Sequence, residues 1–517
     1  MTRPFSRQAF YGTAVFLSSA GGLVLEIVAG RLIAPYVGMS LYTWTAIIAV
    51  VLAGFSIGHW IGGRLAGPDC DAPVGARRVA YALTLAAVSS AASLVLLRWF
   101  SAPILSAGLP VLASIVALAA LLFLLPSLFV GIVSPILTKL AVDASPGDPG
   151  RAIGRMYALS AVGSIAGTLA AGYLFISWIG STGTVLAVAA VYALLALLFA
   201  RPPQALPTVA ALLAILGAGF GFAGWRTGAF SAPCHVESDY YCIRVEDVSR
   251  EFGRPAAVMV LDHLAHGIND RDDPRRLHSS YLHFLDEYAR QRLAPPTPLR
   301  VLVAGGGALT LPRAWLANRD AVTITVAELD PMVTRVAMDR LWVGSDPRLS
   351  ILHGDARLTL QSLPARADFD IVFSDVFHDI SIPAHLVTRE YHQAVKARLA
   401  PGGFYAANVI EGGAWPRFLY SLVRTLAEDF SHVDVWFDAT DATGGKRSTY
   451  IVVASETPTL TSSLAAGSGD SRTWIRSPYS LLAPRITQAD VPVLTDDYAP
   501  VDRLLSHVIL DRELSER

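Results

Sequence analysis

The stretch "VLVAGGGALTLPRAW", residues 301–315, decides the fold of the second half of this chain. It opens with an apolar, β-type run, continues through Gly305, Gly306 and Gly307, and ends with the character of a helix. A glycine loop between a strand and a helix is typical of nucleotide and nucleoside sites, because a side chain there would collide with the ligand or forbid the turn. The three glycines are therefore predicted to bind a nucleoside-like cofactor, although a tight turn alone would also need them. The next residue, Ala308, carries no charge.

Strand and helix patterns alternate after this loop. Such alternation predicts a mostly parallel, Rossmann-like sheet covered on both faces, with ligands at the carboxyl ends of the strands. The strand segments are 321–330, 349–355, 369–377, 402–410, 432–439 and 448–455. Before the loop, residues 237–248 and 254–267 are expected to form a short β-hairpin. Residues 455–490, rich in Ser, Thr, Gly and Pro, are expected to be a mobile loop or lid.

An acidic residue ends each of the next three predicted strands. Glu328 ends the second strand ("VAELD"), Asp355 the third, just before Ala356 ("HGDAR"), and Asp375 the fourth ("FSDVF"). Carboxylates gathered at one sheet edge repel one another and lose solvation, which disfavours a purely structural role. An acidic crevice disfavours a pyrophosphate and suits a cation. The pattern therefore favours S-adenosylmethionine or its decarboxylated form, both sulfoniums, over NAD.

The first two fifths of the chain have a different composition. Residues 1–226 contain 12 Lys and Arg and 5 Asp and Glu, whereas the other 291 residues contain 29 and 37. Apolar stretches of about 20 residues, the length that crosses a hydrocarbon core of ~30 Å, recur there. The predicted spans are 10–33, 41–66, 78–99, 103–125, 152–178, 182–200 and 206–225, with a shorter eighth candidate at 127–142. Their many Gly and Ala residues favour a closely packed helical bundle.

The predicted location is the inner cell membrane, crossed several times. The arginines at the amino terminus and near residues 64–78 place that end of the bundle in the cytoplasm by the positive-inside rule. Seven spans would put the second half outside the cytoplasm, and eight would return it. Because the expected cofactor is made in the cytosol, the soluble half is expected on the cytoplasmic side.

Cysteine and histidine patterns give no metal signature. Cys70, Cys234 and Cys242 form no CxxC pair, so no metal is expected. Cys234 and Cys242 would form a disulfide in an oxidising compartment, but two isolated buried thiols are the favoured interpretation. No basic run with interleaved aromatics is present, so a nucleic-acid partner is not expected.

Several ordered motifs resemble those of the spermidine synthase family, the polyamine aminopropyltransferases. They are "ESDYYCIRV", "VLDHLAHG", "VLVAGGGALTLP", "ITVAELDPMV", "LHGDAR", "FDIVFSDVF" and "LAPGGFYAANV". The whole chain, including "LTDDYAPVDRLL" near its end, is similar to the membrane-fused branch of that family. The resemblance implies a polytopic helical bundle of seven to eight spans joined to a methyltransferase-like α/β domain. The expected divisions are a transmembrane domain (1–226), a β-hairpin and linker region (227–298), the Rossmann-like domain (299–454) and a loop and C-terminal segment (455–517).

The resemblance also implies roles for individual residues. Glu328 would bind the ribose and Asp355, with Ala356, the adenine, while the glycine loop seats the nucleoside. Asp375 would hold and deprotonate the attacking amine, since a protonated amine cannot attack carbon. Further substrate contacts are expected from Tyr240, His266, Tyr281 and Asp379.

The chain departs from the family pattern at several of these positions. Ala308 stands where the family has the Asp that holds the ammonium of the aminopropyl group. His266 replaces a Gln, and only the Tyr of a Tyr-His-Glu cluster is kept, as Tyr281. The second Asp of the catalytic loop falls on His378, beside Asp379.

The first functional hypothesis is transfer of an aminopropyl or related alkyl group from decarboxylated S-adenosylmethionine to an amine such as putrescine. The alternative is methyl transfer from S-adenosylmethionine to a small or lipidic acceptor. A third hypothesis is a transporter or sensor whose soluble domain binds a polyamine or nucleoside without turnover. The expected partners are a small amine and the lipid bilayer, and a homodimer is a further expectation.

Overall fold

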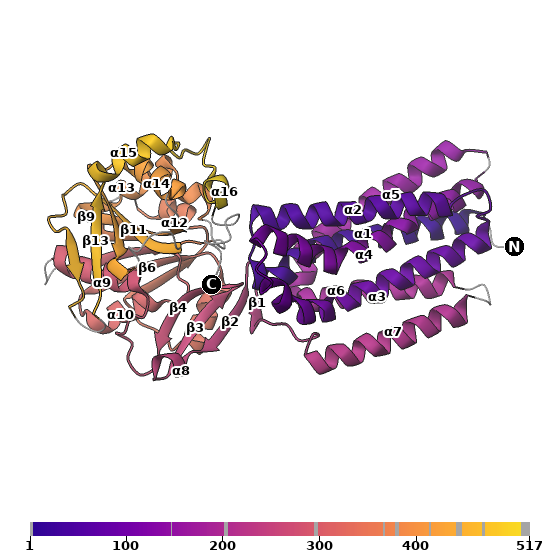
Figure 1. The fold of residues 1–517 in the computed structure, drawn as a ribbon, viewed down its shortest axis with the longest axis horizontal. Helices are drawn as coiled ribbons and strands as arrows, with labels where there is room; N and C mark the ends of the chain where they lie inside the picture. The colour runs from indigo at the N-terminus through magenta and orange to yellow at the C-terminus, as the bar shows by residue number, and fades with distance from the viewer. Residues whose placement is uncertain are drawn as a thin grey trace. The chain divides into compact units, whose positions relative to one another are not determined.

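The computed structural model describes residues 4–145, 147–200, 205–293, 298–364, 368–377, 382–412, 415–440, 447–467 and 471–507. The chain divides into two compact units, Met1–Pro233 and Cys234–Arg517. Each unit is described separately below (Figure 1). The expected boundary at residue 226 falls at the end of the last helix of the first unit.

The secondary structure of the first unit is all helical in its described residues. Its elements are α1 (Pro4–Val37), α2 (Leu41–Leu65), α3 (Ala72–Leu105), α4 (Val111–Asp143), α5 (Pro149–Ala170), the π-helical turn η1 (Ala171–Phe175), α6 (Ile176–Phe199) and α7 (Leu206–Thr227). Six helical segments are long and apolar enough to cross a membrane, and one of them, Pro149–Phe199, contains a kink at Gly180.

The prediction of a separate eighth span at 127–142 is wrong. These residues are the second half of α4, which continues through Pro126 and Pro135. Proline is tolerated inside such helices because neighbouring helices and local adjustments satisfy the backbone groups that it frees.

Glycines let the helices of this unit approach closely, as their composition predicts. A Cβ on Gly58 of α2 would lie 2.1 Å from the carbonyl oxygen of Leu128 in α4. A Cβ on Gly167 of α5 would lie 2.2 Å from the carbonyl oxygen of Ala20 in α1. Small residues at these contacts allow backbone-to-backbone packing where no hydrophobic force drives helices together.

The second unit contains two sheets and their helices. The elements before the glycine loop are β1 (Val236–Glu237), β2 (Cys242–Asp247), α8 (Ser249–Phe252), β3 (Ala256–Leu261), β4 (Leu264–Asp270), α9 (Ser280–Arg292) and β5 (Leu299–Ala304). Those after it are α10 (Thr310–Asn318), β6 (Val322–Glu328), α11 (Pro331–Arg340), β7 (Leu349–His353), α12 (Ala356–Ser362), β8 (Phe369–Ser374), η2 (Ala384–Leu386), α13 (Arg389–Lys396), β9 (Leu399–Gly412), α14 (Arg417–Ala427), β10 (His432–Asp438), β11 (Arg447–Ser455), β12 (Ser463–Ala465), β13 (Thr473–Pro478), α15 (Tyr479–Ala489) and α16 (Val501–Leu504).

The larger sheet has nine strands in the order β12-β13-β10-β11-β9-β8-β5-β6-β7. The five strands from β9 to β7 are parallel, and the other four join antiparallel. Alternate residues of β5 enter different cores: Val301 and Val303 face one, Leu302 and Ala304 the other. Both faces of the sheet are therefore covered, as the apolar runs predict.

The smaller sheet is antiparallel, in the order β1-β2-β3-β4, and extends the expected hairpin. The expected thiols at Cys234 and Cys242 are instead a disulfide, with a Cα–Cα distance of 5.2 Å. The antiparallel pairing of β1 with β2 places Glu237 opposite Cys242, and the segment just before β1 leaves this register so that Cys234 also lies beside Cys242.

The expectation of a mobile loop or lid at 455–490 is also wrong. This segment contains β12, β13 and α15. Leu464, Trp474 and Ile486 are almost fully buried and anchor these elements to the unit. The sequence did not indicate these elements, because their few apolar residues are separated by many small polar ones.

Candidate functional site

The candidate site is a crevice where the strand order of the larger sheet reverses. From β5 the chain proceeds outward to β6 and β7, and then returns to the other side of β5 with β8. Ligands of open α/β sheets bind outside the carboxyl ends of the strands at such a point. Glu328 ends β6, and Asp375 directly follows β8. The predicted acidic residues therefore meet at the same edge as the glycine loop.

The glycine loop is shaped by its protein neighbours. Gly305 has a φ of +89°, and a Cβ on it would lie 2.2 Å from the carbonyl oxygen of Asp375. Gly307 has a φ of +48°, and a Cβ there would lie 2.9 Å from the carbonyl oxygen of His266. Glycine is needed at both positions because other residues rarely adopt positive φ and no space is left for a side chain. The loop therefore packs between the end of β8 and strand β4 of the smaller sheet.

Glu328 is 6% exposed and already engaged by backbone groups. Its Oε2 accepts hydrogen bonds from the N–H groups of Gly306 (2.8 Å) and Gly307 (3.1 Å), and its Oε1 accepts one from Asp330 (2.9 Å). Burial raises the pKa of the Glu328 carboxyl, and these three N–H groups oppose that rise. A carboxylate offers about four acceptor sites, so about one remains for a ligand hydroxyl. If Glu328 were to accept from both ribose hydroxyls, one of these backbone bonds would have to be released.

Asp375 is held from two sides. Tyr281 of α9 donates its hydroxyl to Oδ2 at 3.0 Å, and Asn408 of β9 donates its Nδ2 to Oδ1 at 2.9 Å. Burial raises the pKa of Asp375, while the bonds from Asn408 and Tyr281 oppose that rise. Burial and the negative charge of Asp375 raise the pKa of Tyr281, so its phenol keeps the proton that it donates. The two hydrogen bonds fix the orientation of the carboxylate, and its burial makes it more basic.

Asn408 was not among the residues singled out from the sequence. The only signal is a polar residue inside the apolar stretch "GGFYAANVI". Its Oδ1 is buried and has no hydrogen-bond partner among the described residues. An unpaired buried acceptor next to Asp375 is a further group that could bind a donor from a substrate.

Asp355 has a structural role in addition to the expected adenine contact. Its Oδ1 caps α12 by accepting from the N–H groups of Arg357 and Leu358, both at 3.0 Å. Its Oδ2 lies 2.6 Å from Nε2 of His385. Burial would raise the pKa of Asp355, but the His385 contact and the two N–H groups outweigh it and lower the pKa.

The segment near the C-terminus fastens this corner of the crevice. Arg357 forms two hydrogen bonds with Asp496, at 2.7 and 2.6 Å, and Thr388 donates to the same carboxylate at 2.8 Å. Neither His385 nor Asp496 was expected from the sequence to lie here, because both contacts join residues far apart along the chain. Ala356, the predicted neighbour of the adenine, is buried at the start of α12.

The remaining predicted substrate contacts differ in their surroundings. His266 lies on β4 against the glycine loop, and burial, with help from His263, lowers its pKa to about 4. Tyr240 is 43% exposed, and its ring contacts that of Tyr241. Asp379, like His378, falls outside the described residues.

Ala308 is 1% exposed and packs beneath the smaller sheet. A Cβ on Gly267 would lie 2.8 Å from the Ala308 methyl group, and Asn269 of β4 donates its Nδ2 to the Ala308 carbonyl oxygen at 3.0 Å. This position therefore serves the contact between the two sheets and supplies no charge to the crevice.

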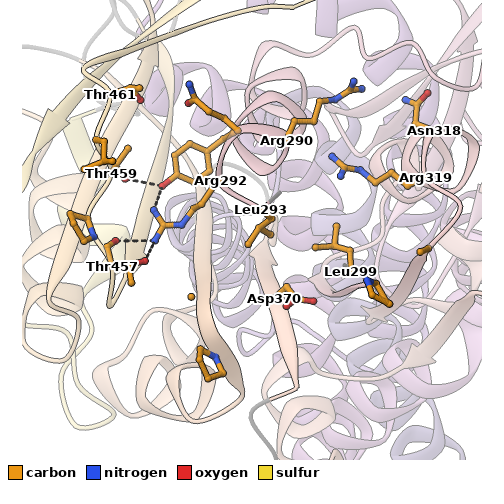
Figure 2. A pocket seen from close by; sticks show the side chains of 18 of the residues that line it. Arg290, Arg292, Leu293, Leu299, Asn318, Arg319, Asp370, Thr457, Thr459 and Thr461 are labelled. Atoms are coloured by element: carbon orange, nitrogen blue, oxygen red, sulfur yellow. Dashed lines mark hydrogen bonds between the residues drawn. The ribbon is translucent and has the colours of Figure 1, made fainter. Parts of the chain in front are cut away.

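A separate groove of about 1080 Å³ opens at the opposite edge of the sheet (Figure 2). It is lined by Leu299 at the start of β5 and Asp370 near the start of β8, together with Arg290, Arg292 and Arg319. Its position at the amino ends of the strands separates it from the acidic crevice. Among the residues that the structure describes, no cluster of His, Cys, Asp or Glu could hold a metal ion.

The geometry defines a Rossmann-like α/β unit with an acidic crevice at its switch point. No family model matches the chain. Over 436 residues, 80% of this chain and 76% of the relative, the chain is 26% identical to a Streptomyces coelicolor protein named polyamine aminopropyltransferase 2. A Vibrio vulnificus polyamine aminopropyltransferase is 29% identical over 126 residues, which is 23% of this chain and 42% of that protein.

Among solved structures, a probable spermidine synthase from Corynebacterium glutamicum aligns over 97% of its chain and 52% of this one, with 23% identity and a TM-score of 0.45. The names of the curated relatives are those of enzymes that transfer aminopropyl groups. The resemblance to spermidine synthase-like enzymes is thereby confirmed.

Proposed function

We propose that this protein is a membrane-anchored transferase that moves an aminopropyl or related alkyl group from decarboxylated S-adenosylmethionine to a small amine such as putrescine. The observation that carries the proposal is Asp375, a partly buried carboxylate fixed by Tyr281 and Asn408 at the switch point of the sheet. The similarity to a named aminopropyltransferase along 80% of the chain supports the same reaction.

The proposed reaction depends on the raised pKa of the Asp375 carboxyl and on the positive charge of the sulfonium donor. Asp375 accepts a proton from the amine, whose freed lone pair attacks the carbon attached to the sulfonium sulfur. The new C–N bond forms as the C–S bond breaks, and methylthioadenosine leaves with the bonding electrons. Burial makes the Asp375 carboxylate a stronger proton acceptor, as a general base requires.

The residues of the crevice fit a nucleoside donor in part. Glu328 has about one acceptor position left for a ribose hydroxyl. Asp355 lies at the end of the neighbouring strand, and its Oδ2 already contacts His385. The buried, uncharged Ala308 gives no partner to an aminopropyl ammonium. This one observation favours a second candidate, methyl transfer from S-adenosylmethionine, which the test below separates from the first.

The test offers each donor, with putrescine, to the full chain purified in detergent and identifies the released nucleoside. We expect methylthioadenosine from the decarboxylated donor, and a fall in turnover of ~10²–10⁴ in Asp375→Asn, which keeps the size of the side chain but removes the proton acceptor. Asp370→Asn, at the other end of β8, is the matched control and should retain turnover. Release of S-adenosylhomocysteine would favour methyl transfer, and binding without either product would favour a sensor.

A further inference from the structure

In the described residues, the chain of the first unit runs from one end of the helical bundle to the other seven times. Only six long apolar segments are found, because one of them contains both α5 and α6. The segment Pro149–Phe199 has 51 residues, about 76 Å of helix at 1.5 Å per residue, against a hydrocarbon core of ~30 Å. Gly180 interrupts it with a φ of 69° and a ψ of 172°. This one segment therefore runs along the bundle twice, and each such run is called a leg below.

Contacts with α1 show that these two legs run in opposite directions. Gly163 and Gly167 of α5 approach Phe16 and Ala20, so α5 runs parallel to α1. In α6, by contrast, Tyr192 donates to the carbonyl oxygen of Ser18, while Phe199, further along the chain, stacks on Tyr11. Because α6 is antiparallel to α1, the chain reverses between α5 and α6 (Figure 1). With α7 the number of legs is seven, an odd number.

Basic residues are concentrated at one end of this bundle. The end that contains the start of α1 has seven among the described residues: Arg7, Arg64, Arg77, Arg78, Lys139, Arg151 and Arg155. The other end has three: Arg31, Arg98 and Arg226. An excess of Lys and Arg marks the cytoplasmic side of short loops. The start of α1 is thus assigned to the cytoplasm, and the end of α7 to the opposite side.

The cysteines give an independent indication of the same orientation. The disulfide Cys234–Cys242 lies just after α7, in the first residues of the second unit. Cys70, between α2 and α3 at the arginine-rich end, is a free thiol. Disulfides persist in oxidising compartments and are rare in the cytosol, where thiols stay reduced.

We propose that the α/β unit faces the non-cytoplasmic side of the membrane, with the Cys234–Cys242 bridge formed in that compartment. The odd number of legs, the distribution of basic residues and the placement of the cysteines all point to this orientation. It replaces the expectation from the sequence that the soluble half is cytoplasmic, which depended on where the cofactor is made. The inference depends on the path of the chain and not on the proposed transfer reaction.

Single-cysteine labelling tests the orientation. In a Cys70→Ser background, Gly344→Cys probes the α/β unit and Gly147→Cys the loop between α4 and α5. Both glycines are exposed, and a Cβ on either has open space around it. A membrane-impermeant maleimide is applied to intact spheroplasts, after both variants are shown to label in permeabilised ones.

We expect Gly344→Cys to label in intact spheroplasts and Gly147→Cys only after permeabilisation. Protection of Gly344→Cys in intact spheroplasts would overturn the proposal, as would labelling of Gly147→Cys. The background chain tests the bridge separately: denatured without reductant it should take up no maleimide, and after reduction two per chain. Two reactive thiols before reduction would show that the bridge does not form and would overturn that part of the proposal.

Discussion

Replacement of Tyr281 by Phe should make the transfer reaction more sensitive to acid. The hydroxyl of Tyr281 donates to Oδ2 of Asp375 at 3.0 Å and stabilises the ionised carboxylate. A hydrogen bond to a charged group contributes about 1.5–3 kcal/mol, and one pKa unit corresponds to about 1.36 kcal/mol. The loss of this bond should therefore raise the pKa of Asp375 by about 1–2 units.

The direction of the pH effect follows from the proposed role of Asp375 as proton acceptor. Only the ionised carboxylate is active, so a higher pKa moves the acid limb of the kcat/KM profile to higher pH by the same 1–2 units. The bond from Asn408 persists in the variant and should keep the carboxylate in place, so the rate above the new pKa should be largely retained.

The measurement is kcat/KM against pH for the wild type, Tyr281→Phe and a matched Tyr288→Phe. The Tyr288 hydroxyl contacts Thr459 and Arg292 at the groove on the opposite edge of the sheet, so its removal should leave the acid limb unmoved. An acid limb that stays in place in Tyr281→Phe would refute the assignment of Asp375 as the titrating base. A general loss of rate at all pH values would instead mean that Tyr281 acts through the substrate.

Three further outcomes are expected. Glu328→Ala should weaken binding of every adenosyl compound by about 10- to 150-fold, because one charge-assisted hydrogen bond of about 1.5–3 kcal/mol is lost. Calorimetry measures the affinities, and unchanged values would show that these compounds do not bind in this crevice. Gly305→Ala should lower the free energy of unfolding by at least ~1–3 kcal/mol, because its φ is positive and its Cβ would meet Asp375, whereas Gly344→Ala should not; equal unfolding curves would contradict the loop geometry. Because the pKa of His266 falls to about 4 on folding, the unfolded chain binds the extra proton, and stability should decline as the pH drops from about 6.5 toward 4. Thermal unfolding of His266→Gln should show a shallower decline over that range, and an identical slope would exclude His266 as its source.

The convergence of Glu328, Asp355 and Asp375 at one edge could be predicted from the sequence. Each residue ends an apolar run, and parallel strands bring their carboxyl ends together whatever the details of packing. The bundle of long apolar helices was equally predictable, since a membrane span requires a minimum apolar length. These features depend on local composition and on the period of the pattern.

Other features depend on register and could not be predicted. Asn408 meets Asp375 because Ala407 pairs with Ser374 in the parallel ladder of β8 and β9, and no local signal specifies that alignment. The disulfide required the pairing of β1 with β2, and the reversal at Gly180 required the direction of α6 against α1. Contacts of this kind arise between segments distant in sequence, where composition carries no information.

The bond between Arg357 and Asp496 makes the corner of the crevice at Asp355 dependent on a segment 139 residues further along the chain. Arg357 follows the cap residue of α12 by two positions, and the same Asp496 holds Thr388 at the start of α13. Any shortened version of the protein that ends before Asp496 would leave the Arg357 guanidinium without its carboxylate and loosen two helix starts at once. Affinity tags and fluorescent fusions at the C-terminal end should therefore be joined well after residue 507, with a flexible spacer, so that this anchor can still form.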